Sequence, residues 1–219
     1  SRGLGDVYKR QAFGAIDSTG AVVIPIEYTN SLTSVNNGRL GVQKNASWFY
    51  VDMKGQIVSD KYDRIGNFHQ GYASVCLNKL WGAIDLQNRV VVPLEWQGVA
   101  PIVDPKLIWV KKDNLYYLYD GVQKSIRLKQ GFANASNFDN EMAYVMSDGK
   151  WGIIDPDGKV LVPCLFEKEE DMVLAKQYML AEDKKNLTEV EALRVIARFD
   201  PDTNMFKITS VIPDKHWDY

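Results

Sequence analysis

The stretch Lys150-Trp151-Gly152-Ile153-Ile154-Asp155 decides the fold, because it returns along the chain at nearly fixed intervals. Each copy opens with an aromatic residue and closes with an aspartate, and successive copies start 35, 33, 35 and 35 positions apart. Self-similarity at this period predicts a tandem array in which neighbouring repeats bury each other's apolar faces. The opening aromatics, called head aromatics below, and the closing aspartates are the predicted structural anchors of the repeats: Phe13, Trp48, Trp81, Tyr116 and Trp151, with Asp17, Asp52, Asp85, Asp120 and Asp155.

The third repeat shows how a repeat is built. Residues 72–77 and 81–85 form two strand-like runs joined by a bend at 78–79, and a third run over 89–92 ends at Pro93. Three short strands with turn residues every eight to twelve positions predict an all-β fold. The fifth repeat follows the same plan, so we expect about five three-stranded repeats.

Two local features have steric explanations. The aspartate begins a D-x-x-G turn, as in Asp155-Pro156-Asp157-Gly158, where its carboxylate accepts a backbone N–H and glycine supplies a positive φ. The fourth repeat runs from Asp120-Gly121 directly into Val122, which predicts a tighter turn. The glycine after the head aromatic is expected to let a ring of a neighbouring repeat lie against the backbone.

The repeats also alternate. Repeats one, three and five carry this glycine and a downstream proline (Pro25, Pro93 and Pro163), whereas repeats two and four have Phe49 and Tyr117 instead of the glycine. We therefore expect the even repeats to pack differently. The head aromatics are predicted to be the principal core residues, since burying such a ring removes about 150–250 Å² from water.

The array is expected to occupy residues 12–166. Residues 167–219 are interpreted as a degenerate repeat or C-terminal β cap, with a first strand over 172–176 and a strand pair over 193–199 and 205–212. Residues 1–11 resemble the translated end of a sequencing adaptor on a metagenomic fragment, or form a polar tail. The native start is then expected further upstream, and the cellular compartment stays open.

Composition narrows the classes of partner. The 219 residues are 46% apolar and carry a net charge of −2, with acidic and basic residues interspersed. The sequence has no long run of basic residues that could contact a phosphate backbone, so no nucleic-acid partner is expected. No apolar run is long enough to span a bilayer. Cys76 and Cys164 are interpreted as buried small hydrophobes.

The units resemble the WG-repeat family. Near-consensus copies are Trp151-Gly152-Ile153-Ile154-Asp155 with Val160-Leu161-Val162-Pro163, and Trp81-Gly82-Ala83-Ile84-Asp85 with Val90-Val91-Val92-Pro93. A third copy runs from Phe13 to Pro25, so the resemblance covers about residues 12–166. It implies a mostly bacterial, all-β repeat protein that mediates interactions and has no assigned enzymatic activity.

Chemistry-bearing motifs are sparse. Only His69 and His216 are present, no nucleophile elbow, phosphate-binding loop or metalloprotease motif occurs, and the acidic run 200–204 is typical of a hairpin turn. No catalytic residue, cofactor or metal ligand is therefore assigned, and the chain is not expected to be an enzyme.

Two functions from different classes remain. The preferred hypothesis is a scaffold that binds another protein through its repeated surface. The alternative is a carbohydrate or cell-envelope binding module, in which exposed rings stack on sugars, with Trp96, Trp109 and Tyr117 as the candidate rings. Three strands in about 35 residues are few for a four-stranded propeller blade, so an open, solenoid-like array is preferred to a propeller-like ring.

Overall fold

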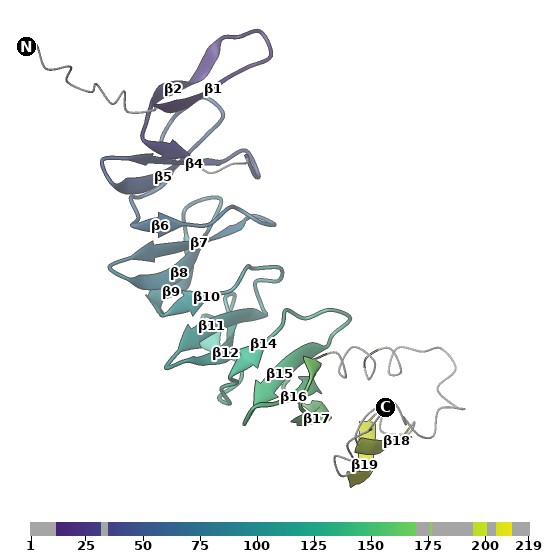
Figure 1. Ribbon diagram of the computed structural model, residues 1–219. Coiled ribbons are helices and arrows are strands. Elements are labelled where there is room, and N and C mark those ends of the chain that lie inside the picture. The colour runs from purple at the N-terminus through teal and green to yellow at the C-terminus, as the bar shows by residue number, and fades with distance from the viewer. Residues whose placement is uncertain (1–11, 32–34, 170–175, 177–194, 201–204, 212–219) are drawn as a thin grey trace, which may run out of the picture. The chain divides into compact units, whose positions relative to one another are not determined.

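The computed structural model describes residues 12–31, 35–169, 176, 195–200 and 205–211. Within these residues, every element with defined bounds is a strand, and the strands form small sheets of two to four members (Figure 1). The chain is therefore an all-β tandem array, with one small sheet for each predicted repeat. The strands of the first three sheets are β1 (Phe13–Ile16) and β2 (Val22–Tyr28); β3 (Asn30–Ser31), β4 (Leu40–Lys44) and β5 (Ser47–Val51); and β6 (Arg64–Ile65), β7 (Tyr72–Leu77), β8 (Leu80–Asp85) and β9 (Val90–Trp96). The remaining strands are β10 (Gly98–Val99), β11 (Ile108–Lys112), β12 (Leu115–Asp120) and β13 (Ser125–Ile126) in the fourth sheet; β14 (Asn134–Ala135), β15 (Ala143–Ser147), β16 (Lys150–Ile154) and β17 (Val160–Phe166) in the fifth; and a hairpin of β18 (Val195–Asp200) and β19 (Met205–Val211).

The third sheet has four strands in the order β6-β7-β8-β9, one more than the sequence predicts. The additional strand, β6, contains only two residues, which is too short to produce a period in the sequence. The bend between β7 and β8 is a two-residue hairpin turn, with positive φ at Asn78 (53°) and Lys79 (68°). Because the third, fourth and fifth sheets are four-stranded, the number of strands per repeat no longer favours an open array over a propeller-like ring, and the open form stays a prediction.

The predicted alternation of odd and even repeats is confirmed by the last strand of each sheet. β2, β9 and β17 each have seven residues, whereas the second sheet continues after β5 only through the isolated bridges Val51↔Ile57 and Trp48↔Tyr62. Pro93 lies inside β9, so the prediction that it ends the strand is wrong. β9 is an edge strand, where a missing N–H need not interrupt the ladder.

The glycine after the head aromatic is required by the next strand of its own sheet. A Cβ on Gly152 would lie 2.6 Å from the Val162 oxygen and 2.8 Å from the Cys164 nitrogen. The register between β16 and β17 shifts here, between Trp151 and Ile153, which brings the two backbones together. The expected contact with a ring of a neighbouring repeat is therefore wrong.

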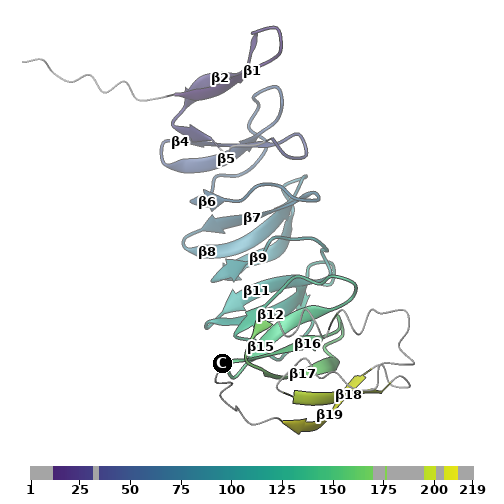
Figure 2. The same cartoon turned by 45° about the vertical axis from the view of Figure 1, so that its right-hand side comes forward.

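The chain divides into two compact parts, one comprising residues up to Val110 with Asp120–Lys124, the other Lys111–Tyr119 with Ser125 onward. In the first part, the sheets follow one another in chain order, with β4 and β5 between β1–β2 and β6–β9 (Figures 1 and 2). Neighbouring sheets share their cores, as the repeat pattern predicts. One cluster joins the first and second sheets, and another joins the second and third: Ile24, Tyr28, Leu40, Val42 and Val51; and Tyr50, Tyr62, Phe68, Ala73, Val75 and Ile84.

The second part contains the predicted C-terminal strand pair. β18 and β19 pair antiparallel from Val195↔Val211 to Asp200↔Met205. Lys176 has helical backbone, which corrects the predicted strand at this residue; residues 172–175 lie outside the described residues, as do residues 1–11. The buried Lys176 ammonium lies 2.7 Å from an Asp139 oxygen and over the Tyr144 ring, so it ties this segment to the fifth sheet.

Candidate binding site

The closing aspartates hold the turns of their repeats. Asp155 Oδ1 accepts N–H bonds from Asp157 (3.0 Å) and Lys159 (2.8 Å), two and four residues on. Asp17, Asp52 and Asp85 make the same two backbone bonds. In the fourth repeat, Asp120 accepts from Val122 and Gln123, and the positive φ falls on Lys124. Four residues separate β12 from β13, as four separate β8 from β9, so this turn has a different conformation but is no shorter, and the prediction of a tighter turn is wrong.

Asp85 is the best enclosed of the described D-x-x-G/N aspartates. Its Oδ1 accepts from the backbone N–H groups of Gln87 and Arg89, and its Oδ2 lies 2.7 Å from Arg89 Nε. Burial raises the pKa of this carboxyl, but the hydrogen bonds and the charge of Arg89 outweigh burial, so the pKa lies below its ordinary value. A hydrogen bond from the Thr19 hydroxyl lowers the pKa of Asp17, and one from the Gln56 N–H lowers that of Asp52.

The lowered pKa values of Asp17, Asp52 and Asp85 predict that the folded chain loses stability in acid. Because their pKa values are lower in the folded chain than the unfolded value of about 3.9, their contribution is complete above about pH 4 and is lost as the pH falls through the folded values. Asp85→Asn should lower the free energy of unfolding by about 1–3 kcal/mol at pH 7. In urea titrations repeated at several pH values, the variant should also lose less stability than the wild type as the pH falls, which gives a flatter acid limb. Asp148→Asn, in a hairpin turn at φ 51°, is the matched control; an unchanged acid limb in Asp85→Asn would contradict the assignment.

The head aromatics are less buried than the ring that faces each of them across the sheet. Phe13 is 38% exposed, Trp48, Trp81 and Tyr116 are half-buried, and only Trp151 is buried. Their partners are all buried, so the prediction that the head aromatics are the principal core residues is wrong for Phe13, Trp48, Trp81 and Tyr116, whereas Trp151 is in the core as predicted. The five facing pairs are Phe13↔Tyr28, Trp48↔Tyr62, Trp81↔Trp96, Tyr116↔Phe132 and Trp151↔Phe166.

The rings proposed for sugar stacking are mostly in the core. Trp96 is 6% exposed and Trp109 only 1%, so neither ring offers a face to a ligand, and the prediction is wrong for both. Tyr117 is half-buried and its ring lies against Gly131, where an added Cβ would be 2.9 Å from the tyrosine Cζ. Tyr117 alone stays a candidate.

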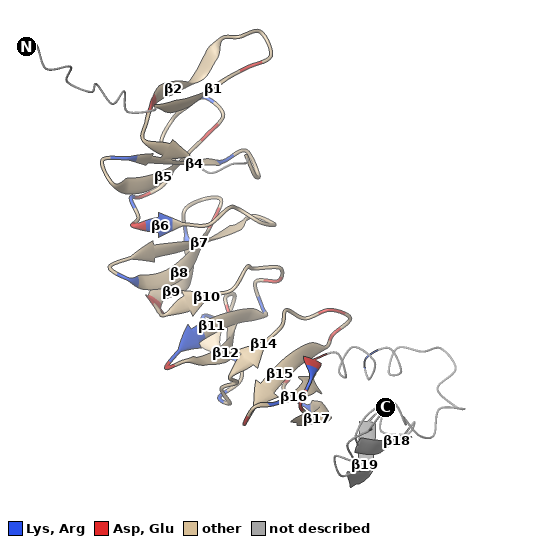
Figure 3. Cartoon of the chain, viewed as in Figure 1, with Lys and Arg blue, Asp and Glu red and all other residues tan. Residues whose placement is uncertain are grey.

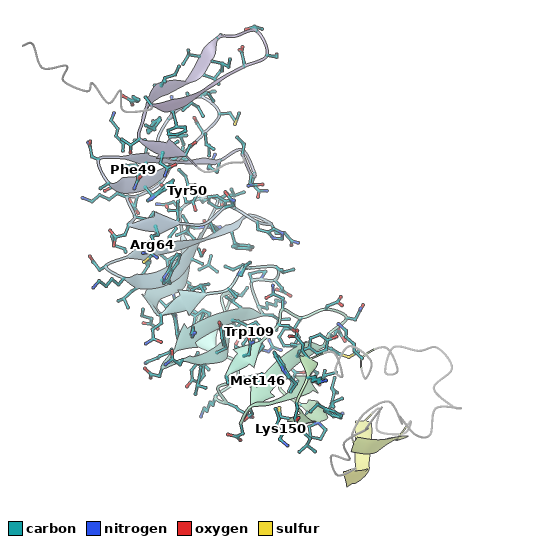
Figure 4. All side chains as sticks on the ribbon, in the orientation of Figure 1. Phe49, Tyr50, Arg64, Trp109, Met146 and Lys150 are labelled. Carbon is teal, nitrogen blue, oxygen red and sulfur yellow. The ribbon has the colours of Figure 1, made fainter. Side chains whose placement is uncertain are left out.

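A half-open cavity of about 290 Å³ lies on the third sheet, lined by Asp63, Arg64, Cys76, Lys79 and Trp81. Three of these residues form one row across the sheet, because Arg64 faces Cys76 and Cys76 faces Trp81. Acidic and basic residues adjoin at β6 in Figure 3, and Arg64 is labelled on this strand in Figure 4. The cavity thus combines two cations, one carboxylate, a thiol and the half-buried face of a tryptophan.

The charged groups of the cavity have different roles. Asp63 Oδ2 accepts the Asn78 N–H at 2.7 Å, and the Asp63 N–H donates to the Cys76 oxygen at 2.8 Å, so this residue supports the β7–β8 turn. Among the described residues, no hydrogen bond or ion pair involves the Arg64 guanidinium or the Lys79 ammonium. Burial raises the pKa of the Cys76 thiol and the nearby Asp63 raises it further, which keeps the thiol protonated at neutral pH.

Comparison with the other repeats shows that the fold does not require these charges. The backbone bond made by Asp63 is made by Thr29 in repeat two and by Ala133 in repeat five. Arg64 corresponds to Asn30 and Asn134, and Lys79 to Ala46 and Gly149. Repeats two and five therefore lack the charged set of repeat three. The sequence analysis did not identify this charged set, because it considered catalytic motifs. An alignment of the repeats would have shown that these charges are absent from the equivalent positions of other repeats.

The described part of the chain contains neither a metal-binding cluster nor a membrane-spanning helix. No three histidine, cysteine, aspartate or glutamate side chains there are grouped so that they could hold a metal ion. No helix there has the length and apolar character needed to cross a membrane.

The repeats match a known family. The WG containing repeat matches residues 13–48, 48–81, 81–116 and 151–168, which together exceed half of the chain. The chain belongs to the WG-repeat family. The matched WG repeats start at the head aromatics, and the stretch without a match contains the fourth repeat, in which Tyr116-Tyr117 replaces Trp-Gly.

Other comparisons concern the fold alone. No curated protein matches the chain. A crystal structure described as the eukaryotic initiation factor is similar over 73% of this WG-repeat chain and 51% of its own, with 11% identity and a TM-score of 0.52. The chain is also similar to Kluyveromyces lactis Hsv2p, with 11% identity over 60% of this chain and 48% of that one and a TM-score of 0.37. A protein of unknown function from Bacteroides caccae is similar with 15% identity over 70% of this chain and 74% of its own, and a TM-score of 0.30. The chain spans about half the length of the first of these structures.

Proposed function

We propose that this WG-repeat chain is a non-catalytic scaffold that binds other proteins, and that the cavity of repeat three receives an acidic side chain of the partner. The observation that carries the proposal is the pair of cations, Arg64 and Lys79, beside the half-buried face of Trp81. Because repeats two and five fold with neutral residues at these positions, the fold does not need the two charges, which leaves them available for a ligand.

The chemistry of the cavity favours a carboxylate flanked by apolar groups. A guanidinium and an ammonium attract an anion, and a planar guanidinium can bind both carboxylate oxygens. The Trp81 ring offers an apolar surface to the neighbouring side chain. Asp63 disfavours a second acidic group at the same place, which would restrict the sequences that fit.

Other functions receive less support. The carbohydrate alternative depends on exposed rings, and Trp96 and Trp109 are in the core. For an enzyme, the nearest candidate nucleophile would be Cys76, but this buried thiol has a raised pKa and no histidine lines the cavity.

Binding to short acidic peptides tests the proposal. We expect peptides with a central glutamate between apolar residues to bind the chain more tightly than their glutamine counterparts in fluorescence anisotropy, and salt to weaken the binding. Arg64→Ala or Lys79→Ala should reduce the affinity about tenfold, which is about 1.4 kcal/mol. Lys54→Ala, an exposed lysine in the turn after β5, should leave it unchanged.

The outcomes separate the hypotheses. Equal binding of the glutamate and glutamine peptides, or an Arg64→Ala variant that binds like the wild type, would reject the cavity as the contact point. Binding of neutral oligosaccharides that depends on Tyr117 would instead favour the carbohydrate module.

A further inference from the structure

Position 76 carries a shorter side chain than the equivalent positions of the following and preceding repeats. Cys76 lies five residues before the head aromatic Trp81. The residues five positions before Trp48, Tyr116 and Trp151 are Gln43, Lys111 and Met146. These three side chains are all long and unbranched. The third repeat therefore has a short side chain where the second, fourth and fifth have a long one.

The pairing of the strands places this position beside the head aromatic. In repeat five, Met146, labelled in Figure 4, faces Trp151 across the hairpin of β15 and β16. In repeat three, Cys76 faces Trp81 in the same way. Residues directly opposite in an antiparallel pair point to the same face of the sheet and lie side by side. The side chain at this position is thus the neighbour of the head ring.

Repeats two and four follow the same arrangement. In repeat two, Gln43 faces Trp48 across the hairpin of β4 and β5. In repeat four, the Nζ atom of Lys111 lies 5.3 Å from the centroid of the Tyr116 ring. The chain itself therefore supplies a long side chain beside the head ring in these repeats, and in repeat four this side chain lies over the ring.

The cavity of repeat three lies where that long side chain is missing. Cys76 and Trp81 both line the cavity. Arg64, which faces Cys76 from the neighbouring strand, lines it as well. The space beside the Trp81 ring thus corresponds to the place of an ordinary side chain of the repeat, and it has room for a side chain from another molecule.

Repeat two indicates which side chain fits this space. Its row across the sheet consists of Asn30, Gln43 and Trp48, because Asn30 faces Gln43. In repeat three, the cation Arg64 stands at the place of the neutral Asn30. Glutamate has the length and shape of glutamine and carries the charge that complements a guanidinium.

We propose that the cavity receives a glutamate side chain of the partner, at the place that Gln43 occupies in repeat two, and that Cys76 is the residue that keeps this place open. This assignment, which rests on the proposed function, names the acidic residue that the cavity selects. The methylene groups of glutamate lie against Trp81, and its carboxylate reaches Arg64 and Lys79. Aspartate has one methylene fewer and buries less apolar surface against the ring.

Peptides that differ only in their central residue test the choice of glutamate. They carry glutamate, aspartate or glutamine between the same apolar residues, and the chain is kept reduced. In fluorescence anisotropy, we expect the glutamate peptide to bind at least about fourfold more tightly than the aspartate peptide, which is the effect of one buried methylene.

Variants of Cys76 test its role in keeping the space open. Cys76→Met and Cys76→Gln introduce the side chains of repeats five and two, and each should weaken binding of the glutamate peptide at least about tenfold although Arg64 and Lys79 are unchanged. Cys76→Ala leaves the space open and should bind like the wild type. Cys164→Met, at the other free cysteine, is the matched control and should also bind like the wild type. Circular dichroism verifies that each variant is folded.

The results separate this inference from the proposed function. Equal affinity for the glutamate and aspartate peptides would overturn the choice of glutamate, and a folded Cys76→Met variant that binds like the wild type would overturn the role of Cys76. Either result leaves the proposed function standing as long as the glutamate peptide binds more tightly than the glutamine peptide. If Cys76→Met does not fold, the comparison of the glutamate and aspartate peptides on the wild type still decides.

Discussion

Gly152→Ala should destabilise the fifth sheet by about 3 kcal/mol, the upper range for forcing an extra carbon into a packed site. The new Cβ would lie 2.6 Å from the Val162 oxygen and 2.8 Å from the Cys164 nitrogen, and both are backbone atoms that cannot rotate away. Relief would require β16 and β17 to separate where their register shifts. Urea unfolding followed by tryptophan fluorescence would measure the change.

Gly149→Ala is the matched control for this substitution. Gly149 has φ +73° in the turn between β15 and β16, with no atom within 4 Å of an added Cβ. Ala46 adopts φ 64° at the equivalent place in repeat two, so alanine can occupy this turn. We expect a cost of about 1 kcal/mol. Equal costs for the two variants would show that strand contact is not the reason for the glycine in Trp-Gly.

Trp109→Ala should cost about 3–5 kcal/mol, as is usual when a fully buried aromatic ring is truncated. Trp109 is 1% exposed and is the largest of the fully buried side chains among the described residues (Figure 4). Its removal leaves a cavity that the rigid backbone of β11 cannot close. Thermal or chemical unfolding measures the loss.

Tyr117→Ala is the comparison for Trp109→Ala, since the sequence places the two rings in one group of ligand candidates. Tyr117 is half-buried, and we expect a cost of about 1–2 kcal/mol. A Trp109→Ala variant that unfolds like the wild type would mean that this ring does not support the core.

Much of the fold can be predicted from the sequence because the repeat period, the turn residues and the strand patterns agree. The Asp155 turn and the Asn78-Lys79 hairpin follow from local chemistry that a few residues specify. Strand β6 could not be predicted, because two residues carry no periodic signal. The position of Pro93 was misjudged because proline often ends a strand but also fits an edge strand.

The distribution of burial is harder to predict because it depends on contacts between strands. Trp81 and Trp96 are the same residue type, and only their pairing and the packing behind them make one half-buried and the other buried. The candidate site was missed for a related reason: Asp63, Arg64 and Lys79 are separated in the sequence and come together only through the pairing of β6 with β7 and the turn that follows.

The third and fifth sheets each end, on one side, in a strand of two residues and, on the other, in a strand that contains a proline. A short strand offers few main-chain groups to another molecule, and proline supplies no donor. Lateral growth of these sheets into fibres is thereby discouraged at both borders. A gene can therefore gain further repeats like the third and the fifth by duplication without each new repeat adding a sheet edge for amyloid-like assembly.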